Sequence, residues 1–205
     1  MSLFITFEGG EGSGKSSQAK ILYRTLCKLS LSVLLTHEPG GTLQGERITK
    51  ILKSKENKEL SSLTELLLFN ASRAQLINKV IKPNLKHGTI VISDRFTDST
   101  IAYQGFGRGL NLKLIQTVNN ISTEGIKPDL TILLDVPAEE GLLRKSKQKL
   151  DRFHQEEISF HNRVRSGFLQ LVDEEPDRWF VVNGLLSKKY ISQIIWNRVT
   201  SLLSK

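Results

Sequence analysis

The sequence predicts a single α/β domain built on a five-stranded parallel sheet flanked by helices. Short apolar runs rich in β-branched and aromatic residues alternate with long amphipathic stretches, and 205 residues are enough to bury one sizeable core. Strands separated by long helical connections form βαβ crossovers, so the sheet they build is parallel. We expect one domain over residues 1–205.

Five runs are predicted as strands and seven stretches as helices. The predicted strands are Leu3–Phe7, Ser32–Thr36, Thr89–Ser93, Leu130–Asp135 and Trp179–Val182. The predicted helices are Lys15–Ser30, Gln44–Lys53, Ser62–Leu85, Lys113–Thr123, Glu139–Lys147, Glu156–Glu174 and Lys188–Leu203. The apolar stripe expected to bury the third helix is Leu63, Leu66, Leu67, Ala74, Ile77 and Ile81.

The segment between the first strand and the first helix is rich in glycine. Its letters, FEGGEGSGKSSQ, fit the pattern G-x-x-x-x-G-K-[ST] through Gly9, Gly14, Lys15 and Ser16. Glycines let backbone N–H groups approach an anion, and the following helix N-terminus adds partial positive charge. Lys15 is suited to the β- and γ-phosphates of a nucleoside triphosphate, and the Ser16 hydroxyl to Mg²⁺. The residues assigned to the triphosphate are Gly9, Gly10, Glu11, Gly12, Ser13, Gly14, Lys15, Ser16 and Ser17.

Polar residues follow each predicted strand, and ligands of parallel sheets bind beyond those carboxyl ends. Asp94 and Arg95 come directly after the third strand. Arg95 suits a phosphate, and Asp94 suits Mg²⁺ or its water ligands. At a random position such a pair would be a surface ion pair, but a neighbouring phosphate loop favours the ligand-binding interpretation.

Two further segments are candidates for a site. Phe69 and Arg73 are i,i+4 neighbours on the third helix. An aromatic ring can stack on a base there, and a planar donor one turn away can hydrogen-bond the edge of that base. From spacing alone, the better interpretation is a core phenylalanine and a solvated arginine. The segment DSTIAYQGFGRG, Asp98–Gly109, is predicted as a loop because hydroxyls, an amide and glycines are dense in it.

Composition restricts the class of protein. There is no 18-residue apolar run and no signal-peptide pattern, so we expect no membrane partner. The only cysteine is Cys27, which fits a reducing compartment, and we expect a cytoplasmic location. The net charge is +8, and part of it lies in the run RKSKQKLDR, Arg144–Arg152. That run lacks interleaved aromatic residues, so no nucleic-acid partner is expected.

Six colinear stretches together resemble the bacterial-type thymidylate kinase family. They are FEGGEGSGKSS, EPGG at Glu38–Gly41, FNASR at Phe69–Arg73, DRFTDSTIAYQG at Asp94–Gly105, PDLTILLDV at Pro128–Val136 and LDRF at Leu150–Phe153. The phosphate loop alone is shared by many NTPases, whereas FNASR followed by DRFTDSTIAYQG is far more specific. The resemblance implies a three-layer P-loop nucleoside monophosphate kinase fold. It also implies transfer of the γ-phosphoryl group of ATP to dTMP, with Mg²⁺, in a homodimer packed through helices.

The resemblance also implies roles for single residues. Phe69 stacks on thymine, Arg73 bonds its O4, and Tyr103 lies against the 2′ side of the sugar. Arg95 holds the acceptor phosphate, and Glu11 approaches the 3′-hydroxyl or a metal-bound water. The set assigned to dTMP, with Thr100 and Gln104 by the base and 5′-phosphate, is Glu11, Glu38, Phe69, Arg73, Arg95, Thr100, Tyr103 and Gln104. The metal set is Ser16 and Asp94.

The basic run falls where bacterial-type relatives carry a mobile lid, expected here over residues 141–153. Phosphoryl transfer needs positioning and charge stabilisation, which a basic lid supplies when it closes and excludes water. The lid candidates are Arg144, Lys147, Lys149 and Arg152, with Arg144 assigned to ATP. The catalytic set is Lys15, Arg95, Lys147 and Arg152.

Four positions depart from the family pattern. Lys147 and His37 stand where arginine is usual, and His154 stands where a carboxylate is common. Thr49 occupies a position where relatives often place a phosphate-binding arginine, and Arg47 or Lys50 is the expected substitute. No general base is expected, because the acceptor phosphate oxygen is already anionic.

Three other functions stay open from the sequence. The first is a kinase for another nucleoside monophosphate or a nucleoside, against which Phe69, Arg73 and Tyr103 argue through the resemblance. The second is a P-loop switch or regulatory NTPase, but no guanine-binding N-K-x-D motif follows a strand. The third is a nucleic-acid binder, suggested only by the basic charge.

Overall fold

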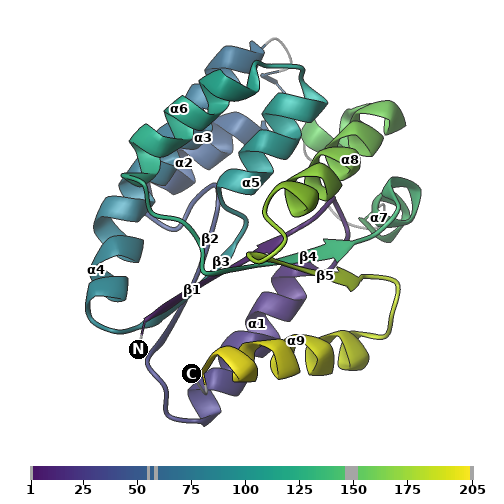
Figure 1. Cartoon of the computed structure of the whole chain (residues 1–205). Helices are drawn as coiled ribbons and strands as arrows, with labels where there is room; N and C mark the ends of the chain where they lie inside the picture. The colour runs from purple at the N-terminus through teal and green to yellow at the C-terminus, as the bar shows by residue number, and fades with distance from the viewer. Residues whose placement is uncertain (1, 55, 58–59, 146–151, 204–205) are drawn as a thin grey trace.

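A computed structural model describes the chain apart from residues 1, 55, 58–59, 146–151 and 204–205. Five parallel strands form one sheet in the order β2-β3-β1-β4-β5 (Figure 1). The strands are β1 (Leu3–Glu8), β2 (Val33–His37), β3 (Ile90–Asp94), β4 (Leu130–Asp135) and β5 (Trp179–Asn183). The α/β class and all five predicted strands are confirmed, with ends that differ by one residue at most.

Helices fill the connections between these strands. The α-helices are α1 (Lys15–Lys28), α2 (Leu43–Lys53), α3 (Ser62–Leu76), α4 (Lys82–Lys86), α5 (Thr97–Thr100), α6 (Leu112–Thr123), α7 (Ala138–Lys145), α8 (Ile158–Glu174) and α9 (Lys188–Leu203). Two π-helical segments, η1 (Ile77–Ile81) and η2 (Ile101–Gly107), and a 3₁₀ turn, η3 (Arg152–Gln155), complete the set. None of the helices within the described residues is long and apolar enough to cross a membrane.

The sheet is covered on both faces, which gives three layers. On one face α1 and α9 pack through Leu22, Leu26, Ile191 and Ile195 against the strands (Figure 1). On the other face lie α3 with η1, then η2 and α8, and they build two further apolar clusters. The carboxyl ends of β1, β2 and β3 stay level, because Phe7 and His37 both pair with Asp94. Every strand end therefore opens on the same edge.

The third predicted helix is interrupted, and its predicted apolar stripe is partly wrong. Residues Ile77–Ile81 adopt a π turn just before Pro83, whose missing N–H prevents a regular α-helical pattern there. Leu63 and Leu67 are 48% and 51% exposed, although both belong to the predicted stripe. The buried face of α3 instead consists of Glu65, Leu66, Asn70, Ser72, Arg73 and Leu76.

The segment predicted as a loop at Asp98–Gly109 is helical. It forms the end of α5 and the π-helical η2, and Ala102 and Tyr103 are buried. The loop prediction rested on the density of glycines, but these glycines allow two helical segments to pack closely. A Cβ at Gly107 would lie 2.6 Å from the Phe160 ring, and one at Gly167 would lie 2.5 Å from the Phe106 ring.

Candidate active site

A cavity of about 750 Å³ opens at the carboxyl ends of the strands. It joins the phosphate loop after β1 to the ends of β2 and β3, and to α3, η2 and α7. The predicted site residues that line it are Glu11, Gly12, Gly14, Lys15, Ser16, Ser17, Glu38, Phe69, Arg73, Asp94, Arg95, Thr100, Tyr103, Gln104 and Arg144. The structure thus brings together residues from six separate segments of the chain, as the strand-end rule predicts.

The phosphate loop has a backbone that only glycines allow. Gly9, Gly12 and Gly14 have φ angles of 137°, 65° and 96°. A Cβ at Gly9 would lie 2.5 Å from the carbonyl oxygen of Leu134, and one at Gly12 only 1.9 Å from that of Gly141. Gly14 is the N-cap of α1 and lines the cavity, so the helix N-terminus and its partial positive charge face the cavity edge. Gly9, Gly10 and Ser13 form the inner side of the loop and do not line the cavity.

Lys15 is a buried cation inside this loop. Its side chain is curled back, and Nζ donates to the Gly10 carbonyl at 2.6 Å and to Ser13 Oγ at 3.1 Å. Burial, with repulsion from Arg95 second, lowers the pKa of Lys15 to about 7. A negative group in the loop would favour the charged amine, so the lysine is arranged to receive an anion.

Ser16 and Asp94, the predicted metal residues, are in direct contact. The Ser16 hydroxyl donates to Asp94 Oδ2, which joins the first turn of α1 to the end of β3. Within the described part of the chain, no cluster of three or more His, Cys, Asp or Glu side chains could hold a metal alone. A hydroxyl and one carboxylate nevertheless fit Mg²⁺, because this ion keeps several waters and takes substrate phosphates as ligands.

The Glu11 carboxylate occupies the middle of the site. Arg95 Nη2 and the Tyr103 hydroxyl donate to Glu11 Oε1 at 2.9 and 3.1 Å. Lys145 donates to Oε2, and His154 Nε2 lies 3.3 Å from the same oxygen. Burial acts to raise the pKa of Glu11, but Arg95, Lys15 and Lys145 together hold it below its usual range. The imidazole of His154 adds no second negative charge beside Glu11, which a carboxylate at this position would do.

Arg95 is held in an unusual conformation by its neighbours. Its φ is 74°, which is uncommon for a residue with a side chain. The guanidinium donates to the Gly9 carbonyl at 3.1 Å and to Ser99 Oγ at 2.9 Å, and lies 5.0 Å from the Tyr103 ring centre. These contacts aim Arg95 across the cavity toward the phosphate loop, where an acceptor phosphate would meet a donor phosphate.

Arg73 is buried, and the expectation of a solvated side chain is wrong. Only 1% of it is exposed. It donates to Glu38 Oε2 at 2.8 Å, to Thr100 Oγ1 at 2.7 Å and to the Phe96 carbonyl at 3.3 Å. It also donates to Asn70 and Asn119 Oδ1. Burial raises the pKa of Glu38, with Arg73 opposing it. Sequence reasoning missed Asn119, because an asparagine on a helix carries no local signal of such a role.

Phe69, Tyr103 and Gln104 line one wall of the cavity, where two aromatic rings lie beside an amide. Phe69 is half-buried, and its ring centre lies 6.1 Å from that of Phe153. Gln104 is buried, and its amide donates to Glu65 Oε1 at 2.7 Å. Glu65, on the buried face of α3, was also missed by the sequence analysis. An exposed aromatic edge beside fixed polar groups suits a planar base with hydrogen-bonding edges.

Residues 146–151, nearly half of the predicted lid, lie outside the described residues. Lys147 and Lys149 fall in the undescribed range 146–151, and the side chain of Arg152 is not described. Arg144, on α7, lines the cavity and donates to the Gly184 carbonyl at 2.9 Å. The lid over residues 141–153 stays a prediction.

Glu8 and Asp98 form a buried acidic pair near Arg95, which the sequence analysis did not single out. Glu8 is fully buried, and it accepts from the Phe96 N–H at 2.8 Å and the Ser99 hydroxyl at 2.6 Å. Burial and the neighbouring Asp98 raise the pKa of Glu8 to about 8. Asp98 in turn receives two hydrogen bonds from Arg178, at 2.7 and 3.0 Å. These contacts fix the start of α5 on the sheet.

Comparison with known proteins adds to this geometry. The family model described as "Thymidylate kinase" matches residues 7–195. The chain belongs to the thymidylate kinase family. A thymidylate kinase of Dehalococcoides mccartyi (strain CBDB1) is 55% identical over 203 residues, which are 99% of this chain and 98% of that protein. One of Nostoc punctiforme is 47% identical and covers 93% of this chain, with 92% of its own length matched.

Solved structures agree with this family. The crystal structure of thymidylate kinase from Ehrlichia chaffeensis matches with a TM-score of 0.80 and 36% identity. The match covers 97% of this chain and 98% of that one. The P-loop nucleoside monophosphate kinase fold expected from the resemblance is therefore confirmed, and so is the thymidylate kinase family itself.

Proposed function

We propose that this protein transfers the γ-phosphoryl group of ATP to dTMP and releases dTDP and ADP. One observation carries the proposal: a single cavity is lined both by the phosphate loop, with Lys15 and Ser16, and by Phe69 and Arg73 of α3. Arg95 lies between them, paired with Glu11. A donor phosphate at Lys15 and an acceptor phosphate at Arg95 would thus meet, which is the positioning that phosphoryl transfer requires.

Each group has a role that follows from its chemistry. Lys15 and the N-terminus of α1 stabilise charge on the donor phosphates. Arg95 holds the acceptor phosphate with a planar pair of donors, which suits phosphate geometry. The acceptor oxygen attacks without losing a proton, so no general base is needed. Glu11, already held by Arg95 and Tyr103, orients those donors toward the incoming nucleotide.

The proposal includes Mg²⁺ and a cytoplasmic location. Ser16 and Asp94 would hold the ion with the donor phosphates, and the bound ion would neutralise charge on them. A single cysteine is compatible with a reducing compartment.

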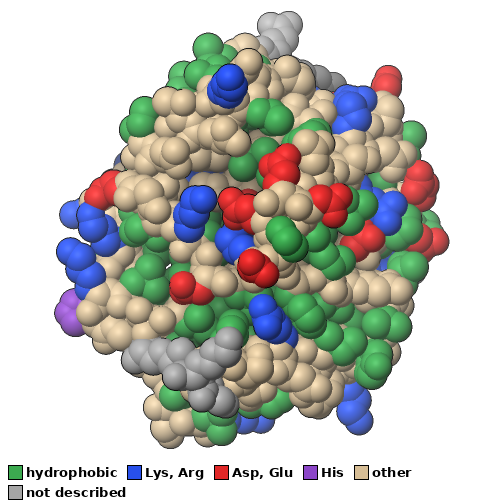
Figure 2. Space-filling model, in the orientation of Figure 1, with side chains coloured by type: hydrophobic (Ala, Val, Ile, Leu, Met, Phe, Trp, Pro, Cys, Tyr) green, Lys and Arg blue, Asp and Glu red, His purple; other side chains and the backbone are tan. Residues whose placement is uncertain are grey.

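A homodimer is also part of the proposal. Three neighbouring helices expose large apolar side chains, and α3 packs against both α2 and α6. These side chains are Leu43 and Ile51 on α2, Leu63 and Leu67 on α3, and Leu114 and Ile121 on α6. Figure 2 shows hydrophobic side chains at the surface on the upper left, where α3 and α6 lie in Figure 1. A second copy of the chain would cover them with a matching apolar face.

The test is a coupled ADP-release assay with ATP and Mg²⁺ against dTMP, dUMP, dCMP, dAMP, dGMP and UMP. We expect a strong preference for dTMP. ADP release that does not depend on any acceptor would contradict the proposed kinase activity. A preference for another monophosphate would contradict dTMP as the acceptor. Lys15→Ala is the matched inactive variant, with kcat expected to fall about 100- to 1,000-fold.

A further inference from the structure

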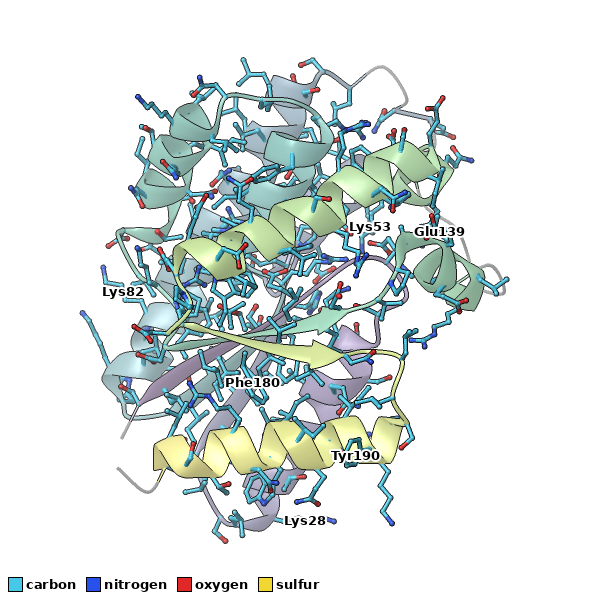
Figure 3. All side chains as sticks on the ribbon, turned by 45° about the vertical axis from the view of Figure 1, so that its right-hand side comes forward. Lys28, Lys53, Lys82, Glu139, Phe180 and Tyr190 are labelled. Atoms are coloured by element: carbon cyan, nitrogen blue, oxygen red, sulfur yellow. The ribbon has the colours of Figure 1, made fainter. Side chains whose placement is uncertain are left out.

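Lys53 is a cation of the cavity that the established family roles do not use. It is the last residue of α2 and lines the cavity, whereas Arg47, Thr49 and Lys50 of the same helix do not. Figure 3 labels Lys53 between α8 and the strand ends, on the side of Glu139 of α7. The expectation that Arg47 or Lys50 replaces the arginine missing at Thr49 therefore has no support in the geometry.

The other cations of the cavity are mostly occupied within the protein. Lys15 bonds the phosphate loop, Arg73 pairs with Glu38, and Arg95 and Lys145 pair with Glu11. In the part of the chain that the structure describes, Lys53 makes no hydrogen bond or ion pair. Lys20 of α1 is likewise unpaired in that part, but it enters the cavity from the opposite face of the sheet. Lys53 is thus an unmatched charge on the acceptor side.

The position of α2 decides which phosphate Lys53 meets. The helix follows the Glu38–Gly41 segment and packs along α3, which carries Phe69 and Arg73. Its N-terminal half is fixed, because Thr42 caps it and Thr49 Oγ1 donates back to the Gly45 carbonyl at 2.8 Å. Thr49 is therefore engaged with its own helix, and Lys53 is one turn further along the same face. Lys53 thus lines the cavity from a helix that packs on α3, and its flexible four-carbon side chain is long enough to turn toward the side of Phe69 and Arg73.

We propose that Lys53 binds the phosphate of the acceptor nucleoside monophosphate together with Arg95, and so raises affinity for the phosphorylated nucleotide over the nucleoside. The inference rests on the proposed function for the identity of the acceptor. The contact is an exposed charge pair, so its contribution is moderate and falls as salt screens it. The contact would stabilise the bound substrate and the transition state about equally, so its loss should raise KM and leave kcat nearly unchanged.

The experiment compares Lys53→Gln with Lys53→Arg and with Lys50→Gln. Lys50 is the control because it is an exposed lysine of the same helix that does not line the cavity. For each variant, KM is measured for dTMP at saturating ATP and for ATP at saturating dTMP. The dissociation constant of thymidine, which lacks the phosphate, is measured by calorimetry beside that of dTMP.

We expect Lys53→Gln to raise the KM and the dissociation constant for dTMP about three- to tenfold. Thymidine binding and the KM for ATP should stay unchanged, Lys53→Arg should restore dTMP binding, and Lys50→Gln should behave like the wild type. The inference would be overturned if Lys53→Gln weakened thymidine binding as much as dTMP binding, or if it raised only the KM for ATP. It would also be overturned if Lys50→Gln, and not Lys53→Gln, weakened dTMP binding. A wild type that binds dTMP without transferring phosphate would refute the proposed function alone, since the calorimetric comparison still tests Lys53.

Discussion

Arg73 is tied to four separate parts of the chain by one guanidinium. Its hydrogen bonds reach Glu38 after β2, Thr100 of α5, Asn119 of α6 and Asn70 of its own helix. A buried arginine is tolerated only when its donors are matched, and these partners match them. Arg73 therefore holds one wall of the cavity together as well as lining it, so the proposed thymine contact would have to replace one of these acceptors.

Arg73→Met should destabilise the fold, because it leaves the Glu38 carboxylate buried without a cation. We expect a loss of about 3–5 kcal/mol in the free energy of unfolding, measured by urea denaturation. The double variant Arg73→Met/Glu38→Gln should recover part of that loss, since the uncompensated charge is gone. Equal stability of the single and double variants would show that the ion pair does not determine the effect.

At the scale of elements, the contact between η2 and α8 depends on two glycines. Gly107 faces the Phe160 ring and Gly167 faces Phe106, so the two helical segments approach more closely than side chains would allow. Because η2 carries Tyr103 and Gln104, this close approach sets the position of one wall of the site.

Gly167→Ala should lower the free energy of unfolding, although alanine is normally the better helix former. A Cβ at this position would lie 2.5 Å from Phe106 Cδ2 and 2.8 Å from Phe106 Cβ, so rotating the ring would not relieve the clash. Overpacking of about 1–3 kcal/mol should exceed the roughly 1 kcal/mol gained from helix propensity. Urea denaturation measures the change, and the exposed Ser166→Ala on the same helix is the control. A more stable Gly167→Ala variant would contradict the packing argument.

The sequence predicts elements where the pattern is local and fails where tertiary packing decides. Strand runs and the glycine-rich turn have residue signatures, so β1 was predicted to within one residue and the start of α1 at Lys15 correctly. The π turns have none, and the glycines of η2 resemble turn glycines until Phe160 is placed against them. The burial of Arg73 could not be predicted, because its partners, such as Asn119 of α6, lie far away in the sequence. Leu63 and Leu67 fit a core periodicity, but they point away from the sheet.

At the scale of the whole molecule, the exposed apolar residues of α2, α3 and α6 lie away from the cavity-lining positions. The residues of α2, α3 and α6 that line the cavity are Phe69, Arg73 and Lys53, and none of the exposed apolar residues is among them. A dimer through the exposed leucines would leave the cavity open, while fixing α3 from its outer side.

Leu67→Glu should convert the proposed dimer to a monomer, because it places a charge on the apolar face of α3. Leu67 is 51% exposed, so the fold itself should tolerate the change. Sedimentation velocity at matched protein concentrations measures the effect. Tyr190→Glu is the control, since Tyr190 is 57% exposed on α9, across the sheet from α3 (Figure 3). A monomeric wild type at micromolar concentration, or a dimeric Leu67→Glu variant, would refute the proposed interface.

The Glu11 carboxylate partly neutralises the cations of the site from within the protein. It already satisfies Arg95 and Lys145, so the free protein carries an internal counter-anion between the two phosphate positions. If the proposed site is correct, an entering phosphate would bind cations that the Glu11 carboxylate already holds. Binding at this site would therefore be an exchange of one anion for another, rather than the pairing of free cations. A doubly charged phosphate would compete with the carboxylate better than a singly charged anion, so the exchange would favour phosphate before any base is recognised.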